Sequence, residues 1–189
     1  MAGKKASKPR RGLALEQFMK LIIINGPCGV GKSTVAKSLH ATMPLSFLFD
    51  IDALMRHVSG YNKLENRERR RTLMLALAEA ILDTCFQHGH DVILDKMIFR
   101  EDILEAHIQT AKRHGAEIHE IILWAPKDVV MQRAIDRGFH EGGLLTPEKC
   151  ELFWEKIDEL RKTRPNAKFI DTSALTEQRV IEAVKKVID

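Results

Sequence analysis

Short apolar runs alternate with longer segments of helical spacing along most of the chain. The apolar runs predict β-strands at 20–25, 47–51, 91–95, 117–124 and 168–171. Between them, apolar residues recur every three or four positions and predict helices at 32–42, 66–88, 101–114, 126–137, 147–162 and 176–188. The pattern is therefore one of strands and helices in alternation.

The predicted strands are apolar at nearly every position. Strands of this kind belong to parallel sheets that helices cover on both faces. With right-handed crossovers, the prediction is an α/β three-layer sandwich with a parallel sheet of about five strands. Ligands of such sheets bind at the carboxyl ends of the strands, so the residues that follow each strand are the candidates for a functional site.

The charge of the chain is unevenly distributed. Its 189 residues suit one domain, and 44% hydrophobic with 30% charged residues is typical of a soluble globular protein. Residues 1–20 hold six basic residues and one acidic residue, a net charge of +5. Because the net charge of the whole chain is +4, residues 21–189 carry −1. We predict a basic, solvated tail at 1–19 and a folded domain at 20–189. Contact of the tail with nucleic acid or acidic lipid is the less favoured alternative.

The three cysteines are Cys28, Cys85 and Cys150, which are far apart and include no CxxC pair. We therefore predict neither a disulfide framework nor a zinc site, as expected in a reducing compartment. No stretch has the ~20 apolar residues needed to cross a bilayer, and the N-terminus lacks the apolar run of a signal peptide. These patterns predict a cytoplasmic protein.

The segment after the first strand, GPCGVGKST, satisfies the pattern G-x-x-x-x-G-K-[ST]. Glycine allows positive φ and close approach, so consecutive N–H groups can surround a phosphate at the start of the next helix. We expect Lys32 to reach the β- and γ-phosphates and Ser33 to ligate Mg²⁺. Cys28 is interpreted as a spacer. The predicted nucleotide site is Gly26, Pro27, Cys28, Gly29, Val30, Gly31, Lys32, Ser33 and Thr34.

Such a loop alone is compatible with kinases, GTPases and other ATPases. A regulatory GTPase needs Asn-Lys-x-Asp after a late strand, whereas this chain has only Asn62-Lys63-Leu64-Glu65, early in the sequence. The Asp-x-x-Gly pattern is also missing after Asp95. These differences favour a kinase.

A kinase must activate an acceptor hydroxyl, and Asp52 is the candidate base at the carboxyl end of the second strand. Asp50 is its competitor, because on a regular strand residues two apart face the same way. The alternative for Asp52 is a helix N-cap. Asp95 ends the next strand and is the candidate to hold a Mg²⁺-bound water, or else to pair with Lys96 or Arg100.

Arg133 and Arg137 are four residues apart and share one helix face, just before the glycine-containing segment 138–146. We predict that this segment is a short lid and that both arginines neutralise charge on the transferring phosphoryl group. The alternative is ordinary pairing with Asp136 and Glu141.

Four segments in order, GPCGVGKST, FLFDIDALMRH, GHDVILDKMIFRED and APKDVVMQRAIDRG, resemble the P-loop kinase group that includes chloramphenicol phosphotransferase, zeta toxins and the polynucleotide kinase domain. The resemblance covers about residues 20–175. It implies a P-loop NTPase fold of the nucleotide-kinase-like type, ATP as donor and a hydroxyl acceptor. It further implies Asp52 as the base and an adenine site near 171–177. Residues 60–72 match no acceptor pocket of this group.

The sequence therefore predicts an ATP- and Mg²⁺-dependent kinase that phosphorylates a hydroxyl of a small molecule such as a nucleoside, sugar or antibiotic. Its catalytic residues would be Asp52, Lys32, Arg133 and Arg137, and its metal ligands Ser33 and Asp95. A polynucleotide end kinase steered by the basic tail is one alternative, against which the −1 charge of the body counts. A non-catalytic nucleotide-binding regulator is another. No membrane partner is expected.

Overall fold

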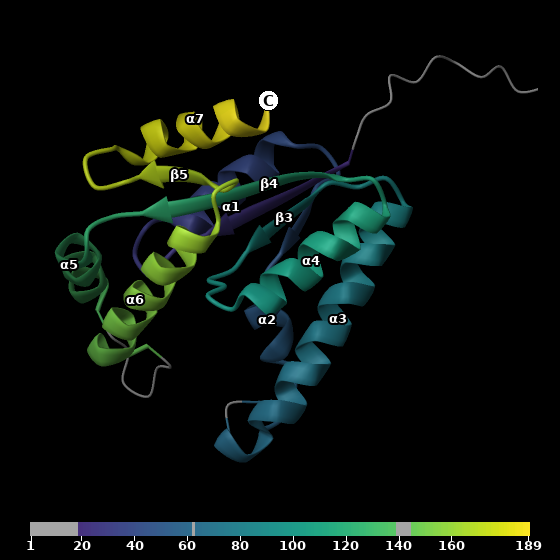
Figure 1. Cartoon of the computed structure of the whole chain (residues 1–189), viewed down its shortest axis with the longest axis horizontal. Helices are drawn as coiled ribbons and strands as arrows, with labels where there is room; N and C mark the ends of the chain where they lie inside the picture. The colour runs from purple at the N-terminus through teal and green to yellow at the C-terminus, as the bar shows by residue number, and fades with distance from the viewer. Residues whose placement is uncertain (1–18, 62, 139–144) are drawn as a thin grey trace, which may run out of the picture.

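A computed structural model describes residues 19–61, 63–138 and 145–189. They contain a five-stranded sheet of order β2-β3-β1-β4-β5, in which each neighbouring pair is parallel (Figure 1). The strands are β1 (Lys20–Asn25), β2 (Phe47–Phe49), β3 (Val92–Asp95), β4 (Glu117–Trp124) and β5 (Lys168–Asp171). The predicted α/β fold with a parallel sheet of about five strands is confirmed. Most of the predicted tail and lid, residues 1–18 and 139–144, lies outside the described residues.

Helices flank the sheet on both faces, and Figure 1 shows α7 on one side with α3 and α4 on the other. Their bounds agree with the sequence prediction to within one residue, apart from α2 and a short 3₁₀ helix, which were not predicted. The helices are α1 (Lys32–Thr42), α2 (Ile51–Met55), the 3₁₀ helix (Leu64–Asn66), α3 (Arg67–Gln87), α4 (Glu101–Arg113), α5 (Lys127–Arg137), α6 (Pro147–Thr163) and α7 (Glu177–Ile188).

The core consists of two apolar layers, one on each face of the sheet. Successive side chains of a strand point to opposite faces, and β1 shows this directly. Leu21 and Ile23 pack in the layer that contains side chains of α3 and α4, whereas Ile22 and Ile24 pack in the layer of α1 and α7. All four are fully buried. This explains why residues 21–24 of β1, the central strand of the sheet, are all apolar.

The chain turns into a helix directly after β2, earlier than the sequence pattern predicts. β2 ends at Phe49, and the Asp50 carboxylate caps α2 by accepting a hydrogen bond from the Ala53 N–H at 3.0 Å. The N-cap is therefore Asp50 and not Asp52, which lies in the first turn of α2. The expectation that Asp50 and Asp52 share one side of a strand is wrong, because neither lies on a strand.

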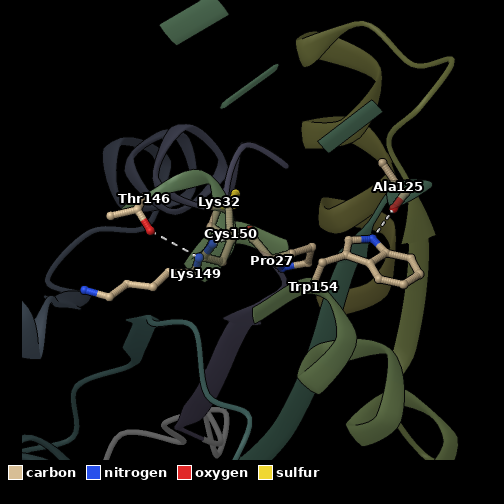
Figure 2. Close-up of a disulfide and its surroundings, with 8 residues drawn as sticks. Pro27, Lys32, Ala125, Thr146, Lys149, Cys150 and Trp154 are labelled. Carbon is tan, nitrogen blue, oxygen red and sulfur yellow. Dashed lines mark hydrogen bonds between the residues drawn. A yellow bond between two sulfur atoms is a disulfide. The ribbon is translucent and has the colours of Figure 1, made fainter. Parts of the chain in front are cut away.

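The cysteine prediction is also wrong. Cys28 and Cys150, 122 residues apart in sequence, form a disulfide between the glycine-rich loop and the first turns of α6 (Figure 2). Spacing along the chain could not reveal this pair, because only the packing of α6 against the loop brings the two together. The disulfide removes the cysteine argument for a reducing compartment. In the part of the chain that the structure describes, no helix is long and apolar enough to cross a membrane.

Candidate active site

The glycine-rich loop connects β1 to α1 and has the backbone geometry of a phosphate cradle. Gly26 has φ 140°, and a Cβ there would lie 2.2 Å from the Leu123 carbonyl oxygen, so no other residue fits. Gly31 has φ 89° and is the N-cap residue of α1. Its conformation aims the first N–H groups of the helix toward the loop, where an anion would be stabilised.

The loop residues predicted from sequence divide into two groups. Those that line a cavity of about 700 Å³ are Cys28, Gly29, Gly31, Lys32, Ser33 and Thr34. Gly26 and Pro27 are buried beneath it, and Val30 lines a neighbouring cavity. The first group can contact a ligand directly, whereas Gly26 and Pro27 shape the loop from below.

Asn25, at the end of β1, hydrogen-bonds the first residue of the glycine-rich loop. It was not predicted as a site residue. Its side chain is fully buried. The amide nitrogen donates to the Ile98 carbonyl at 2.7 Å, and the amide oxygen accepts from the N–H groups of Ile98 and Gly26 at 2.9 and 2.8 Å. One side chain thereby joins the start of the loop to the segment between β3 and α4. The sequence did contain a signal for this role, because Asn25 is a polar residue that directly follows four apolar residues of the strand.

Lys32 lies on the floor of the large cavity. Its ammonium group donates to the Pro27 carbonyl at 2.7 Å. Burial lowers the pKa of Lys32 from 10.5 to about 8, opposed by the Asp95 carboxylate and reinforced by the positive charge of Arg137. A polyphosphate in this cavity would supply the negative charge that favours the protonated amine.

Asp50, Asp52 and Asp95 all line the same cavity as Lys32 and Ser33. Asp52 forms an ion pair with Lys96 across the cavity, from α2 to the end of β3. The alternative in which Asp95 pairs with Lys96 or Arg100 does not occur among the described residues, since Lys96 pairs with Asp52 and Arg100 with Asp102. The arrangement places carboxylates from two strand ends opposite the glycine-rich loop.

Arg133 and Arg137 both line the cavity, but their surroundings differ. The Arg133 guanidinium donates to the hydroxyl and carbonyl of Thr172 at 2.9 and 2.8 Å, so it fastens α5 to the segment after β5. Arg137 is exposed at the end of α5. Neither forms the pair with Asp136 that was the alternative to a catalytic role, since the Asp136 carboxylate accepts a hydrogen bond from Gln132. Glu141 lies outside the described residues.

A smaller cavity of about 170 Å³ continues from the loop toward α7. It is bounded by Gly29, Arg133, Thr172, Leu175 and Val180, among others. Thr172, Leu175 and Glu177, which line it, belong to the segment 171–177 in which the resemblance implies an adenine site. The two cavities share Gly29, Gly31, Thr34 and Arg133 and are therefore continuous along the loop.

Figure 2 shows how α6 closes one side of the loop. Besides the disulfide, the Trp154 indole N–H donates to the Ala125 carbonyl at 2.9 Å, which ties α6 to the end of β4. Trp154 and Trp124 pack against each other with ring centroids 6.0 Å apart. Both tryptophans, which are half-buried, are therefore used in packing.

An α/β sheet with a glycine-rich phosphate loop between β1 and α1, facing carboxylates from the neighbouring strand ends, defines a P-loop kinase fold. The family model described as an AAA domain matches residues 21–151 of this chain. Because the match spans more than half of the chain, the protein belongs to this family. A search of curated proteins gave no significant match.

Solved structures agree on the fold. The chain is similar to a tunicamycin resistance protein of Deinococcus radiodurans, with 22% identity over 89% of this chain and 95% of that chain and a TM-score of 0.62. A gluconokinase from Sinorhizobium meliloti is 16% identical, with 88% and 90% covered and a TM-score of 0.64. A deoxyadenosine kinase from M. mycoides is 17% identical, with 89% and 98% covered and a TM-score of 0.58. The P-loop kinase group named from sequence is confirmed.

Proposed function

We propose that the protein is an ATP- and Mg²⁺-dependent phosphotransferase that moves the γ-phosphate of ATP to a hydroxyl group of a small molecule. The observation that carries this proposal is the single cavity of about 700 Å³ in which the glycine-rich loop and Lys32 face Asp52 and Asp95. A switch protein would need the loop but has no use for a carboxylate aimed at an acceptor.

The chemistry follows from what each side chain can do. Loop N–H groups and Lys32 would hold the phosphates, and the oxygen donors Ser33 and Asp95 suit Mg²⁺ directly or through a bound water. The acceptor oxygen would attack the γ-phosphorus while the bond to the β-phosphate oxygen breaks, releasing ADP. Asp52 would accept the hydroxyl proton, with Lys96 keeping its carboxylate in place.

The two arginines would divide their roles. Arg137, exposed at the cavity and close enough to Lys32 to act on its charge, would neutralise charge on the transferring phosphoryl group. Arg133, held by Thr172, would position the nucleotide base and support the phosphate loop. A cytoplasmic location, where ATP is abundant, is part of the same proposal.

The deciding experiment measures transfer of label from [γ-³²P]ATP to a panel of hydroxyl-bearing small molecules and 5′-OH oligonucleotides. We expect Asp52→Asn to lower transfer by roughly 10²- to 10⁴-fold, the range for a general base, while Mg·ATP binding measured by calorimetry is unchanged. Asp50→Asn is the matched control, because asparagine caps α2 equally well.

Full activity of the Asp52→Asn variant would contradict the assignment of the base. Binding of Mg·ATP without transfer to any acceptor would favour a regulator. Labelling of oligonucleotides alone would favour an end kinase.

A further inference from the structure

A third cavity, of about 310 Å³, adjoins the large one on the side of α3 and α4. Lys96 and Met97 line both cavities, and Ile51, which precedes Asp52, lines the smaller one. A molecule seated in this cavity therefore has to extend only past Lys96 and Met97 to bring a hydroxyl to Asp52. We call it the side cavity.

The side cavity has mostly apolar walls. Phe99 and Phe153 stack on each other with ring centroids 5.7 Å apart and an interplanar angle of 19°. The hydroxyl groups of a free sugar or sugar acid would lose water against such walls without gaining partners. A flat ring would bury its faces favourably. The apolar lining consists of Ile51, Met74, Met97, Ile98, Phe99, Ile103 and Phe153.

The cationic side chains that line the side cavity already have partners. Arg70 donates to the Tyr61 carbonyl at 2.6 Å, and Arg100 pairs with Asp102. Lys96 pairs with Asp52. These three cationic side chains therefore do not by themselves select an anionic acceptor.

His107 is the exception among the polar groups of the side cavity. It is 6% exposed, lines the cavity from α4, and has no hydrogen-bond partner among the described residues. Burial, reinforced by the positive charge of Lys96, lowers the pKa of His107 to about 4. The imidazole is thus neutral at physiological pH and offers one N–H donor and one acceptor nitrogen. Because His107 lines the side cavity, its ring nitrogens are available to pair with a polar group of a molecule bound there.

We propose that the side cavity binds the ring of the phosphate acceptor, and that the acceptor is an alcohol carrying a planar heteroaromatic ring hydrogen-bonded to His107. This inference rests on the proposed function and specifies its substrate class. Nucleosides have this chemistry, because their ring edges carry donors and acceptors and their hydroxyl lies a few bonds away. His107 acts at the ring, remote from the reacting atoms, and so determines specificity.

The test has two readouts, binding without ATP and transfer with it. Equilibrium dialysis with tritiated 2′-deoxyadenosine and thymidine, against D-gluconate and D-glucose, measures binding. We expect the nucleosides to bind at least tenfold more tightly and to give a correspondingly higher kcat/KM. His107→Phe should weaken nucleoside binding at least tenfold and raise KM, whereas His107→Asn restores it to within about threefold. Mg·ATP affinity should not change.

His88→Phe, an exposed histidine at the end of α3, is the matched control. Met74→Trp fills the side cavity without altering His107 and should block nucleoside binding even where His107→Phe does not fold. Stronger binding and transfer with D-gluconate or D-glucose would overturn the inference but leave the kinase proposal standing. So would unchanged nucleoside binding in both cavity variants. Nucleoside binding with no transfer would support the side cavity and overturn the proposed reaction.

Discussion

At the scale of single residues, the buried amine of Lys32 links nucleotide binding to pH. The pKa of Lys32 is about 8 in the free protein, and bound ATP favours the charged amine. Above pH 8, Lys32 must therefore take up a proton when ATP binds. We expect ATP affinity to be constant below about pH 7 and to fall toward tenfold per pH unit above pH 8. Calorimetry at pH 7 and pH 9, in two buffers of different ionisation enthalpy, measures the proton uptake directly.

The same pKa has a consequence for stability. The unfolded chain binds the proton more tightly than the folded protein between pH 8 and 10.5, so the Lys32 contribution to stability rises with pH over that window.

Lys32→Arg keeps a positive charge throughout and should abolish the proton uptake on ATP binding. Equal heats in the two buffers at pH 9 for the unaltered protein would contradict this account.

At the scale of elements, the two arginines of α5 are expected to have different roles, Arg133 in nucleotide binding and Arg137 in catalysis. Because its guanidinium bonds the segment after β5, Arg133→Ala should raise the KM for ATP about tenfold with little change in kcat. Arg137→Ala should mainly lower kcat, because Arg137 faces the cavity from the end of α5. Steady-state kinetics of both variants provides the comparison. A loss of kcat without a change in KM for Arg133→Ala would restore the direct catalytic role predicted from sequence.

The sequence predicted most elements because their apolar patterns are long and regular. β1, β4, β5 and α1 begin and end at the predicted residues. α2 was missed because five residues are too few for helical periodicity, and its capping residue, Asp50, is chosen by the turn that follows β2. The sequence therefore offered Asp52 as the alternative N-cap, whereas the structure has Asp50 in that role and Asp52 in the first turn of α2.

The predicted site was recovered where motifs are local and was incomplete where contacts are distant. The glycine-rich loop could be identified from nine consecutive residues. By contrast, the partners Asn25 and Ile98 are 73 residues apart, and Lys96 and Asp52 are 44 apart. His107 belongs to no motif in the sequence, and only the folded structure shows that it lines a cavity. Such pairs depend on tertiary packing, which periodicity does not specify.

At the scale of the whole molecule, the Cys28–Cys150 disulfide closes a loop of 122 residues. Constraining the unfolded chain over this length contributes about 5 kcal/mol in the chain-entropy account. We expect reduction with dithiothreitol, or Cys150→Ser, to lower the free energy of unfolding measured with urea by several kcal/mol. Cys85→Ser, which removes the free thiol, is the control and should still respond to reduction. Titration of three free thiols in the unreduced, unfolded protein would contradict the disulfide.

The hydrogen bonds of Asn25 to the phosphate loop and to a residue of the side cavity have a thermodynamic consequence. Its amide oxygen accepts from the N–H groups of Gly26 in the phosphate loop and of Ile98, and its amide nitrogen donates to the carbonyl of Ile98, a residue that lines the side cavity. We expect a shift imposed by either ligand to reach the other through this amide, and by reciprocity ATP and acceptor would then alter each other's affinity by the same factor. Asn25→Ala should bring that factor toward one in a fluorescence titration of each ligand with and without the other. On the proposed function, coupling through one amide would let the first ligand to bind change the affinity for the second, in either order of arrival.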